Sequence, residues 1–193
     1  MNFLAHLLLS CEQEELLVGN FLGDFIKNRE VRQLPVAIQQ GVRLHRLIDS
    51  FTDAHPVVRQ GTARLRPRHG KYAGVVLDIL YDYILANNWS SYGPGTLPDF
   101  TQQTYRVLAA YTHLMPSFLQ QRLPHMIADD WLLRYGTREG VAFTFSRLQL
   151  RVSQPQFLEN TLLSLTEHET ALAEDFSRFF PDLTAEAAQF CTC

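Results

Sequence analysis

The chain has 193 residues, of which 46% are hydrophobic and 19% are charged, and its formal net charge is −3. This composition excludes a disordered chain, and the length predicts one domain spanning residues 1–193. With no overall basic charge and no nucleic-acid-binding motif, we expect no nucleic-acid partner. The apolar opening, MNFLAHLLLS, is too short to span a bilayer and lacks the basic start of a signal peptide, so we expect no membrane association.

The cysteines give a second constraint. Cys11, Cys191 and Cys193 have no metal-ligand spacing, and three thiols leave one without a partner. We therefore expect neither a disulfide framework nor a structural zinc site, and a reducing, cytoplasmic setting.

Apolar residues recur with a helical period along most of the chain, and no stretch shows the alternation of a strand. Residues 90–98, SSYGPGTLP, are dense in turn formers and predict a loop, while Pro181 is expected to end the last helix. The fold class is therefore predicted to be all-α. The expected helices cover residues 12–27, 36–54, 56–66, 72–89, 100–114, 118–135, 139–150 and 156–180.

Three of the expected helices each carry two polar residues that are four positions apart among apolar neighbours. Residues with this spacing lie on the same face of a helix, one turn apart. A buried carboxylate without a partner is costly, so it must lose its charge, pair with a cation or bind a metal. The pairs are Asn20 with Asp24, His45 with Asp49, and Asp78 with Asp82. Asp53 lies four residues after Asp49 and shares its helix face, but it is close to the helix end. There its expected role is only to fix the direction in which the chain leaves the helix.

Several carboxylates with an imidazole are donors that suit Mn²⁺, Mg²⁺ or Fe²⁺. His6, in the apolar run FLAHLLL, is a further candidate ligand. The alternative for His6 is a hydrogen-bonded core histidine, and the alternative for the polar rows is a solvated helix face.

A basic stretch follows the second polar pair. Residues 56–77 contain no Asp or Glu, whereas five cations occur between Arg59 and Lys71. Such a patch attracts an acidic protein or a phosphorylated ligand. It can equally be a solvated face that pairs with acids elsewhere in the fold.

Four segments carry a resemblance that covers nearly the whole chain in length and order. They are MNFLAHLLLS, GNFLGDFIK, GVRLHRLIDSFTDAHPVVR and LDILYDYILANNWSSY. Together they resemble the acyl carrier protein phosphodiesterases, a family of fatty acid biosynthesis that is distantly related to the HD-domain phosphohydrolases. The resemblance implies a divergent HD-domain-like helical fold and Mn²⁺-dependent hydrolysis of holo-acyl carrier protein, giving apo protein and free 4'-phosphopantetheine.

The resemblance also implies roles for single residues. His45 is followed by Arg46, where the HD pattern has an aspartate, so the ligands are assigned by position. The implied metal ligands are Asp24, His45 and Asp78, with His6 as a further one. Asp24, Asp49 and Asp82 are the candidate catalytic carboxylates, which hold or orient the attacking water. The implied substrate-binding residues are Asn20, Arg46 for a phosphate oxygen, and Arg64, Arg66, Arg68 and Lys71 for docking of the acidic carrier protein.

Two other functions remain open at this point. One is an HD-type metal-dependent phosphohydrolase that acts on a nucleotide or another small phosphodiester. The other is a non-catalytic helical module that binds an acidic carrier protein, with its carboxylates paired to arginines.

Overall fold

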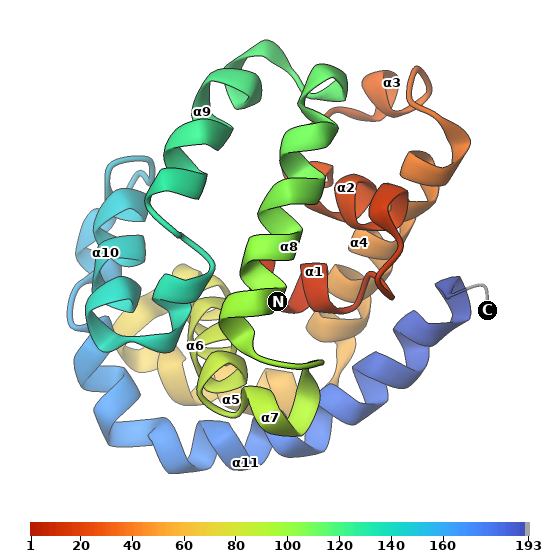
Figure 1. Cartoon of the computed structure of the whole chain (residues 1–193). Coiled ribbons are helices and arrows are strands. Elements are labelled where there is room, and N and C mark those ends of the chain that lie inside the picture. The colour runs from red at the N-terminus through yellow and green to blue at the C-terminus, as the bar shows by residue number, and fades with distance from the viewer. Residues whose placement is uncertain (192–193) are drawn as a thin grey trace.

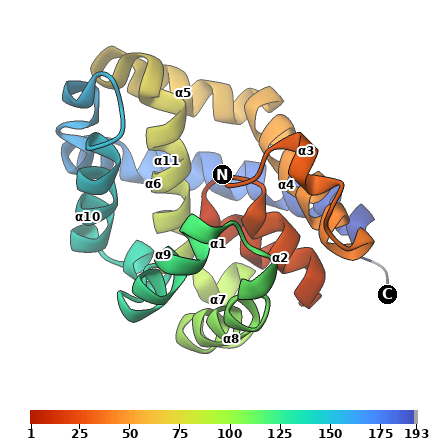
Figure 2. The same ribbon diagram turned by 90° about the horizontal axis from the view of Figure 1, so that it is seen from above.

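The computed structural model describes residues 1–191, and within them it contains helices and no strand, which confirms the all-α prediction. The helices form one compact body (Figures 1 and 2). Short 3₁₀ turns connect several of them. The α-helices are α1 (Phe3–Leu8), α2 (Glu14–Leu22), α3 (Asn28–Val31), α4 (Val36–Ala54), α5 (Pro56–His69), α6 (Ala73–Asn87), α7 (Trp89–Tyr92), α8 (Leu97–Ala110), α9 (Ser117–Ala128), α10 (Arg138–Gln149) and α11 (Thr161–Ala187).

The helix α4 has the bounds that the sequence predicts, and the local chemistry explains why. Pro35 precedes its first residue, and His55, in extended conformation, separates it from Pro56, which begins α5. A residue before a proline is disfavoured in the helical region, whereas proline itself is well tolerated in a first helical turn. Two helices therefore meet at this point with a change in direction.

The prediction that the last helix ends before Pro181 is wrong, because α11 continues through this proline to Ala187. A proline inside a helix removes one backbone hydrogen bond and costs about 3 kcal/mol. Here Phe179, Phe180 and Leu183 are buried on either side of the proline. Burying three such side chains contributes about 1.5–3 kcal/mol each, which outweighs the cost.

Two further expectations differ from the structure. Residues 90–98 are only partly loop, since α7 runs from Trp89 to Tyr92. The helix expected over residues 118–135 ends at Ala128, and Asp130 follows with a positive φ of 46°. The Tyr105 hydroxyl donates to the Asp130 carboxylate at 2.6 Å and accepts from the backbone of Leu132 at 2.9 Å, which stabilises the break.

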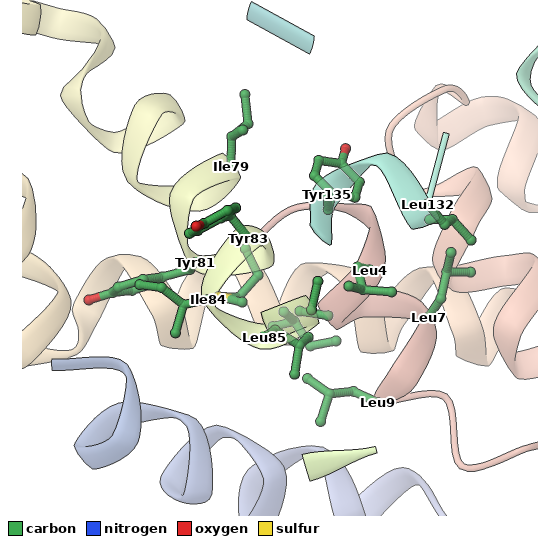
Figure 3. Close-up of a cluster of buried hydrophobic side chains, with 14 of the residues drawn as sticks. Leu4, Leu7, Leu9, Ile79, Tyr81, Tyr83, Ile84, Leu85, Leu132 and Tyr135 are labelled. Atoms are coloured by element: carbon green, nitrogen blue, oxygen red, sulfur yellow. The ribbon is translucent and has the colours of Figure 1, made fainter. Parts of the chain in front are cut away.

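The core surrounds α6, which is apolar on nearly all sides and therefore buried along most of its length. It contacts α1, α5, α10 and α11, and α11 runs along one side of the molecule past α5 and α4 (Figure 1). Figure 3 shows side chains of α6 packed against leucines of the first ten residues and against Leu132 and Tyr135. The N-terminal segment is thus part of the core.

Close packing of α2 against α4 depends on two glycines. A Cβ atom added to Gly19 would overlap the backbone of Ile38, and one added to Gly41 would overlap the backbone of Leu16. The two helices therefore touch through their backbones at this point. This contact fixes the polar faces of α2 and α4 beside each other.

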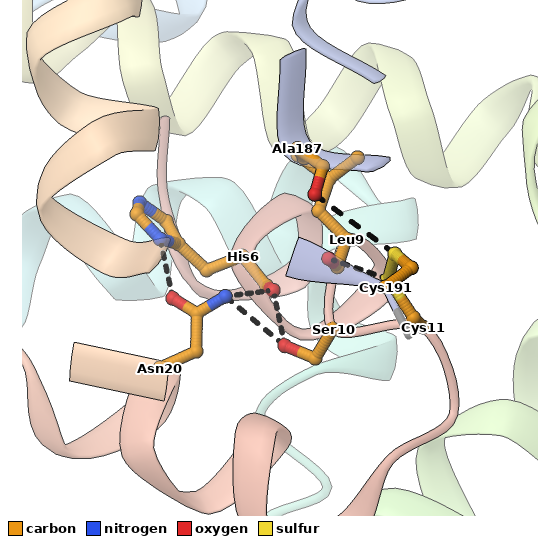
Figure 4. Close-up of a disulfide and its surroundings, with 7 residues drawn as sticks. All are labelled: His6, Leu9, Ser10, Cys11, Asn20, Ala187 and Cys191. Atoms are coloured by element: carbon orange, nitrogen blue, oxygen red, sulfur yellow. Dashed lines mark hydrogen bonds between the residues drawn. A yellow bond between two sulfur atoms is a disulfide. The ribbon is translucent and has the colours of Figure 1, made fainter. Parts of the chain in front are cut away.

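The expectation of no disulfide is wrong, because Cys11 and Cys191 are bonded across 180 residues of sequence (Figure 4). The cysteine spacing could not reveal this bond, since α11 brings the end of the chain back to the turn after α1. Cys193 lies outside the described residues. No helix within residues 1–191 has the length and apolarity needed to cross a membrane.

Candidate metal centre

His6 is held in one orientation by a buried hydrogen-bond network (Figure 4). The Asn20 amide group donates to the His6 carbonyl at 2.6 Å and to Ser10 Oγ at 3.0 Å. Its carbonyl oxygen therefore faces His6 Nδ1, 2.9 Å away. Because a carbonyl oxygen can only accept, Nδ1 carries the hydrogen, and neutral His6 presents the lone pair of Nε2. Asn20 and Ser10 thus select the tautomer that can bind a cation.

The second histidine, His45, stacks on His6 with the ring centroids 4.3 Å apart. It lies on α4 one turn before Asp49, as the i,i+4 spacing predicts, and its Nε2 is 3.2 Å from Asp49 Oδ2. A Cβ atom at Gly23 would overlap the ring of His45. The glycine that ends α2 is therefore required for the position of this imidazole.

Asp49 joins the two imidazoles. Its Oδ1 is 3.2 Å from His6 Nε2, and Asp24 Oδ1 is 3.5 Å from His45 Nε2. The ligand atoms of His6, His45 and Asp49 all lie within 4.8 Å of one another. A lone pair on His6 and a carboxylate oxygen repel each other at this distance unless a proton or a metal ion lies between them. The donor set, two imidazoles and a carboxylate with a second carboxylate beside them, fits a divalent metal.

Burial and these carboxylates control the charge of the centre. Burial lowers the pKa of His6 despite its contact with Asp49. Burial also opposes the charging of His45, but the hydrogen bonds that its Nε2–H donates to Asp24 and Asp49 outweigh it and raise the pKa of His45 to about 9. Burial would raise the pKa of Asp49, yet the two imidazoles hold it well below its usual range. At neutral pH without metal, the proton therefore resides on His45 and Asp49 is ionised.

The third predicted pair, on α6, holds the N-terminal segment. Asp82 is fully buried and accepts from the backbone N–H groups of Leu4 at 2.7 Å and Ala5 at 3.3 Å, in the first turn of α1. Asp78, one turn earlier, accepts from the N-terminal ammonium of Met1 at 3.0 Å. Both carboxylates fix α1, and through it His6. Asp49, and not Asp78, completes the three-residue cluster.

A cavity of about 800 Å³ opens beside this centre. One wall comes from the N-terminal segments and carries carboxylates, among them Asp24, Asp49 and Asp78. A second wall comes from residues 122–151 and carries mainly cations, with Asp129 as the one carboxylate among them. Apolar and aromatic side chains such as Phe25 complete the lining. Sequence patterns could not reveal the second wall, because its residues converge only after α9 and α10 have packed.

The basic residues that the sequence singles out lie in different places. Arg64 pairs with the buried Asp175, and Arg68 pairs with Glu167, both on α11. Arg46 is exposed on α4 and donates to Asn28, and it does not line the cavity. Arg66 is exposed on α5. Lys71 lines the cavity and donates to Ser153 at 3.3 Å. Two of the four predicted docking cations, Arg64 and Arg68, therefore belong to a seam between α5 and α11.

The fold and the site define a helical protein with a buried histidine–carboxylate centre on one wall of a large cavity, a setting in which hydrolases bind divalent metals. The family model of the acyl carrier protein phosphodiesterases matches residues 1–183. The chain belongs to this family.

Individual relatives agree over nearly the full length. The acyl carrier protein phosphodiesterase of Yersinia pestis is 28% identical, and the alignment covers 97% of both chains. The proteins of that name from Serratia proteamaculans, with the same coverage, and from Escherichia coli O157:H7, with 98% of both chains covered, are each 29% identical. No solved structure matches the chain.

Proposed function

We propose that this protein is a metal-dependent phosphodiesterase that hydrolyses the bond between 4'-phosphopantetheine and a serine of holo-acyl carrier protein. Family membership supports the reaction and the substrate. The observation that supports a metal is the convergence of His6 Nε2, His45 Nε2 and both oxygens of Asp49 beside a cavity. The products are apo-acyl carrier protein and free 4'-phosphopantetheine.

His6, His45 and Asp49 would hold the metal. A bound divalent ion lowers the pKa of a water molecule and neutralises charge on a phosphodiester. His6 offers its Nε2 lone pair because Asn20 holds the hydrogen on Nδ1. His45 must first release its proton to solvent, because metal binding and protonation compete for the same Nε2. Mn²⁺ is the ion we propose, with Mg²⁺ or Fe²⁺ as alternatives, since imidazole with carboxylate suits all three.

Asp24 is the carboxylate best placed to act on the substrate side. Its side chain is 48% exposed, lines the cavity and contacts His45 Nε2 at 3.5 Å. It can orient the attacking water and take its proton, as a general base must. This placement supports the catalytic role predicted for Asp24.

Asn20 and Asp82 have positioning roles in this proposal, in place of the substrate-binding and catalytic roles that the sequence predicts for them. Both side chains are fully buried, and neither lines the cavity. Asn20 sets the tautomer of His6, and Asp82 holds the first turn of the helix that carries His6. Loss of either would act on the reaction through His6.

The test is the mass of holo-acyl carrier protein after incubation with the purified protein, with Mn²⁺ or with excess chelator. We expect loss of the phosphopantetheine mass with Mn²⁺ and no change with chelator. Equal cleavage in chelator would contradict the metal centre. Cleavage of small phosphodiesters but not of holo-carrier protein would favour an HD-type phosphohydrolase, and carrier binding without cleavage would favour a non-catalytic module.

A further inference from the structure

The cavity wall formed by residues 122–151 is mainly cationic. Arg122 on α9, Arg147 on α10 and Arg151 just after α10 line it. We call these three the rim arginines. Arg147 and Arg151 are exposed and Arg122 is half-buried, so their guanidinium groups stand where the cavity meets solvent.

The rim arginines differ from the other cations of the cavity in having no partner. Arg134 donates to the backbone of Asp129 and lies over the ring of Phe143. Lys71 donates to Ser153. Within residues 1–191, the side chains of the rim arginines make no hydrogen bond or ion pair. They bring three positive charges to one cavity, against the single carboxylate that Asp129 adds to residues 122–151 of the lining, and such an excess of positive charge attracts an anionic ligand.

Exposed apolar side chains accompany these charges. Leu150, which is 77% exposed, lies next to Arg151 in the chain, and Phe143, which is 40% exposed, lines the cavity on α10. Arginine beside apolar and aromatic groups is the composition of protein interfaces. A site for a free phosphate would need no exposed leucine. The mixture therefore fits a folded partner with an acidic face.

The substrate linkage gives a geometric reason for docking here. This step rests on the proposed function. The phosphodiester is attached to a serine side chain, so the carrier protein's surface must lie within a few bonds of the metal centre. Whichever surface surrounds that serine must then meet the rim of the cavity. Arg64 and Arg68, whose charges are held by α11, are less available for this contact.

We propose that the rim arginines form the surface on which an acidic face of the carrier protein docks. Because rim charges act mainly on encounter and on binding, their loss should weaken association and make it less sensitive to salt. The chemical step at His6, His45 and Asp49 should be affected far less.

The experiment measures binding of apo-acyl carrier protein, the product that lacks the scissile bond, by calorimetry at two salt concentrations. The variants are R147E/R151E, with R147Q/R151Q as a milder form. The matched control is R106E/R178E, which makes the same charge change at exposed arginines on α8 and α11 that do not line the cavity. Arg66→Glu tests docking on α5, and circular dichroism checks the fold of each variant.

We expect at least about ten-fold weaker binding for R147E/R151E with a flatter salt dependence, a smaller loss for R147Q/R151Q, and little change in the control. A loss in R66E that exceeds the loss in the rim variants, or equal losses in the rim and control variants, would overturn the proposal. Failure of the wild-type protein to cleave holo-carrier protein would instead contradict the proposed function. In that case the binding data still decide whether the rim docks an acidic protein.

Discussion

The two walls of the cavity differ in whether their charged groups are buried and paired or exposed and unpaired. Behind the N-terminal wall, His6 and His45 are buried and each contacts Asp49, a carboxylate that lines the cavity. On the wall formed by residues 122–151, the rim arginines reach solvent and have no partner within the described part of the chain. Buried groups that are fixed by neighbours suit the chemical step, whereas unpaired charges at a rim suit recognition. Changes to each wall should therefore have different kinetic signatures.

The largest effect is expected at His45. His45→Gln removes one of two imidazoles from the cluster and should lower kcat/KM by at least about 100-fold, because even the loss of an outer partner of a metal site costs about 10–100-fold. Mn²⁺ binding, measured by calorimetry, should weaken in parallel. Asp53→Asn is the control, since Asp53 lines the cavity but makes no contact with either imidazole. Equal losses in both variants would mean that general charge, and not ligation, matters on this wall.

Two glycines allow a finer test of the same wall. A Cβ atom at Gly23 would overlap the ring of His45, whereas one at Gly74, which lines the cavity, would meet no atom within 4 Å. Gly23→Ala should displace the imidazole and lower kcat by about 10–100-fold, comparable to loss of an orienting partner. Gly74→Ala should keep activity and raise helix stability by up to about 1 kcal/mol. Turnover and thermal unfolding of both variants measure this, and full activity of Gly23→Ala would contradict the observed packing.

The pH dependence of metal binding tests the charge of His45. Its pKa is raised to about 9 in the metal-free protein, so a metal must displace its proton at lower pH. Mn²⁺ affinity should therefore rise about ten-fold per pH unit from pH 7 toward 9 and then level off. In Asp24→Asn, which removes one of the two carboxylates that raise this pKa, the plateau should begin at lower pH. Affinity that is independent of pH in the wild-type protein would exclude His45 as a ligand.

Asp82 should affect stability more than chemistry. Burial raises its pKa from 3.8 to about 7, although hydrogen bonds from Leu4 and Ala5 partly oppose this. Between these values the folded protein binds more protons than the unfolded one, so this group's contribution to stability falls as the pH rises from 3.8 to about 7 and is constant above that. From pH 5 to 8, the wild-type protein should lose about 3 kcal/mol more unfolding free energy than Asp82→Asn, at about 1.4 kcal/mol per pKa unit. Equal losses in urea unfolding would show that the pKa of Asp82 is not raised by folding.

The sequence predicts the parts of the site that depend on spacing along one helix. His45 and Asp49 share a face of α4 because four residues make about one turn, and this pairing could be read directly. His6 and Asn20 could be named, but their hydrogen bond depends on how α1 meets α2. For some residues the structure supports a role other than the predicted one, and in each case the cause is packing between distant segments. Arg64 and Arg68 pair with acids of α11, and α1 covers Asp82. Residues 122–151 showed no polar spacing that would have placed them at the cavity.

For the fold, too, the sequence predicts local features but not those that depend on packing between distant segments. Helical periodicity predicts most helices, and proline before the first turn fixes α4. Periodicity could not predict that α11 continues through Pro181, because this depends on aromatic side chains buried by other helices. The disulfide between Cys11 and Cys191 likewise depends on where the end of α11 returns.

The most direct test of the metal centre is the position of Mn²⁺ in crystals of the protein, located by its anomalous scattering. The structure predicts a peak within bonding distance of His6 Nε2, His45 Nε2 and an Asp49 oxygen, with Asp24 beside it. A peak elsewhere in the cavity, for example at Asp78 without either histidine, or no peak in crystals grown with saturating Mn²⁺, would contradict the account.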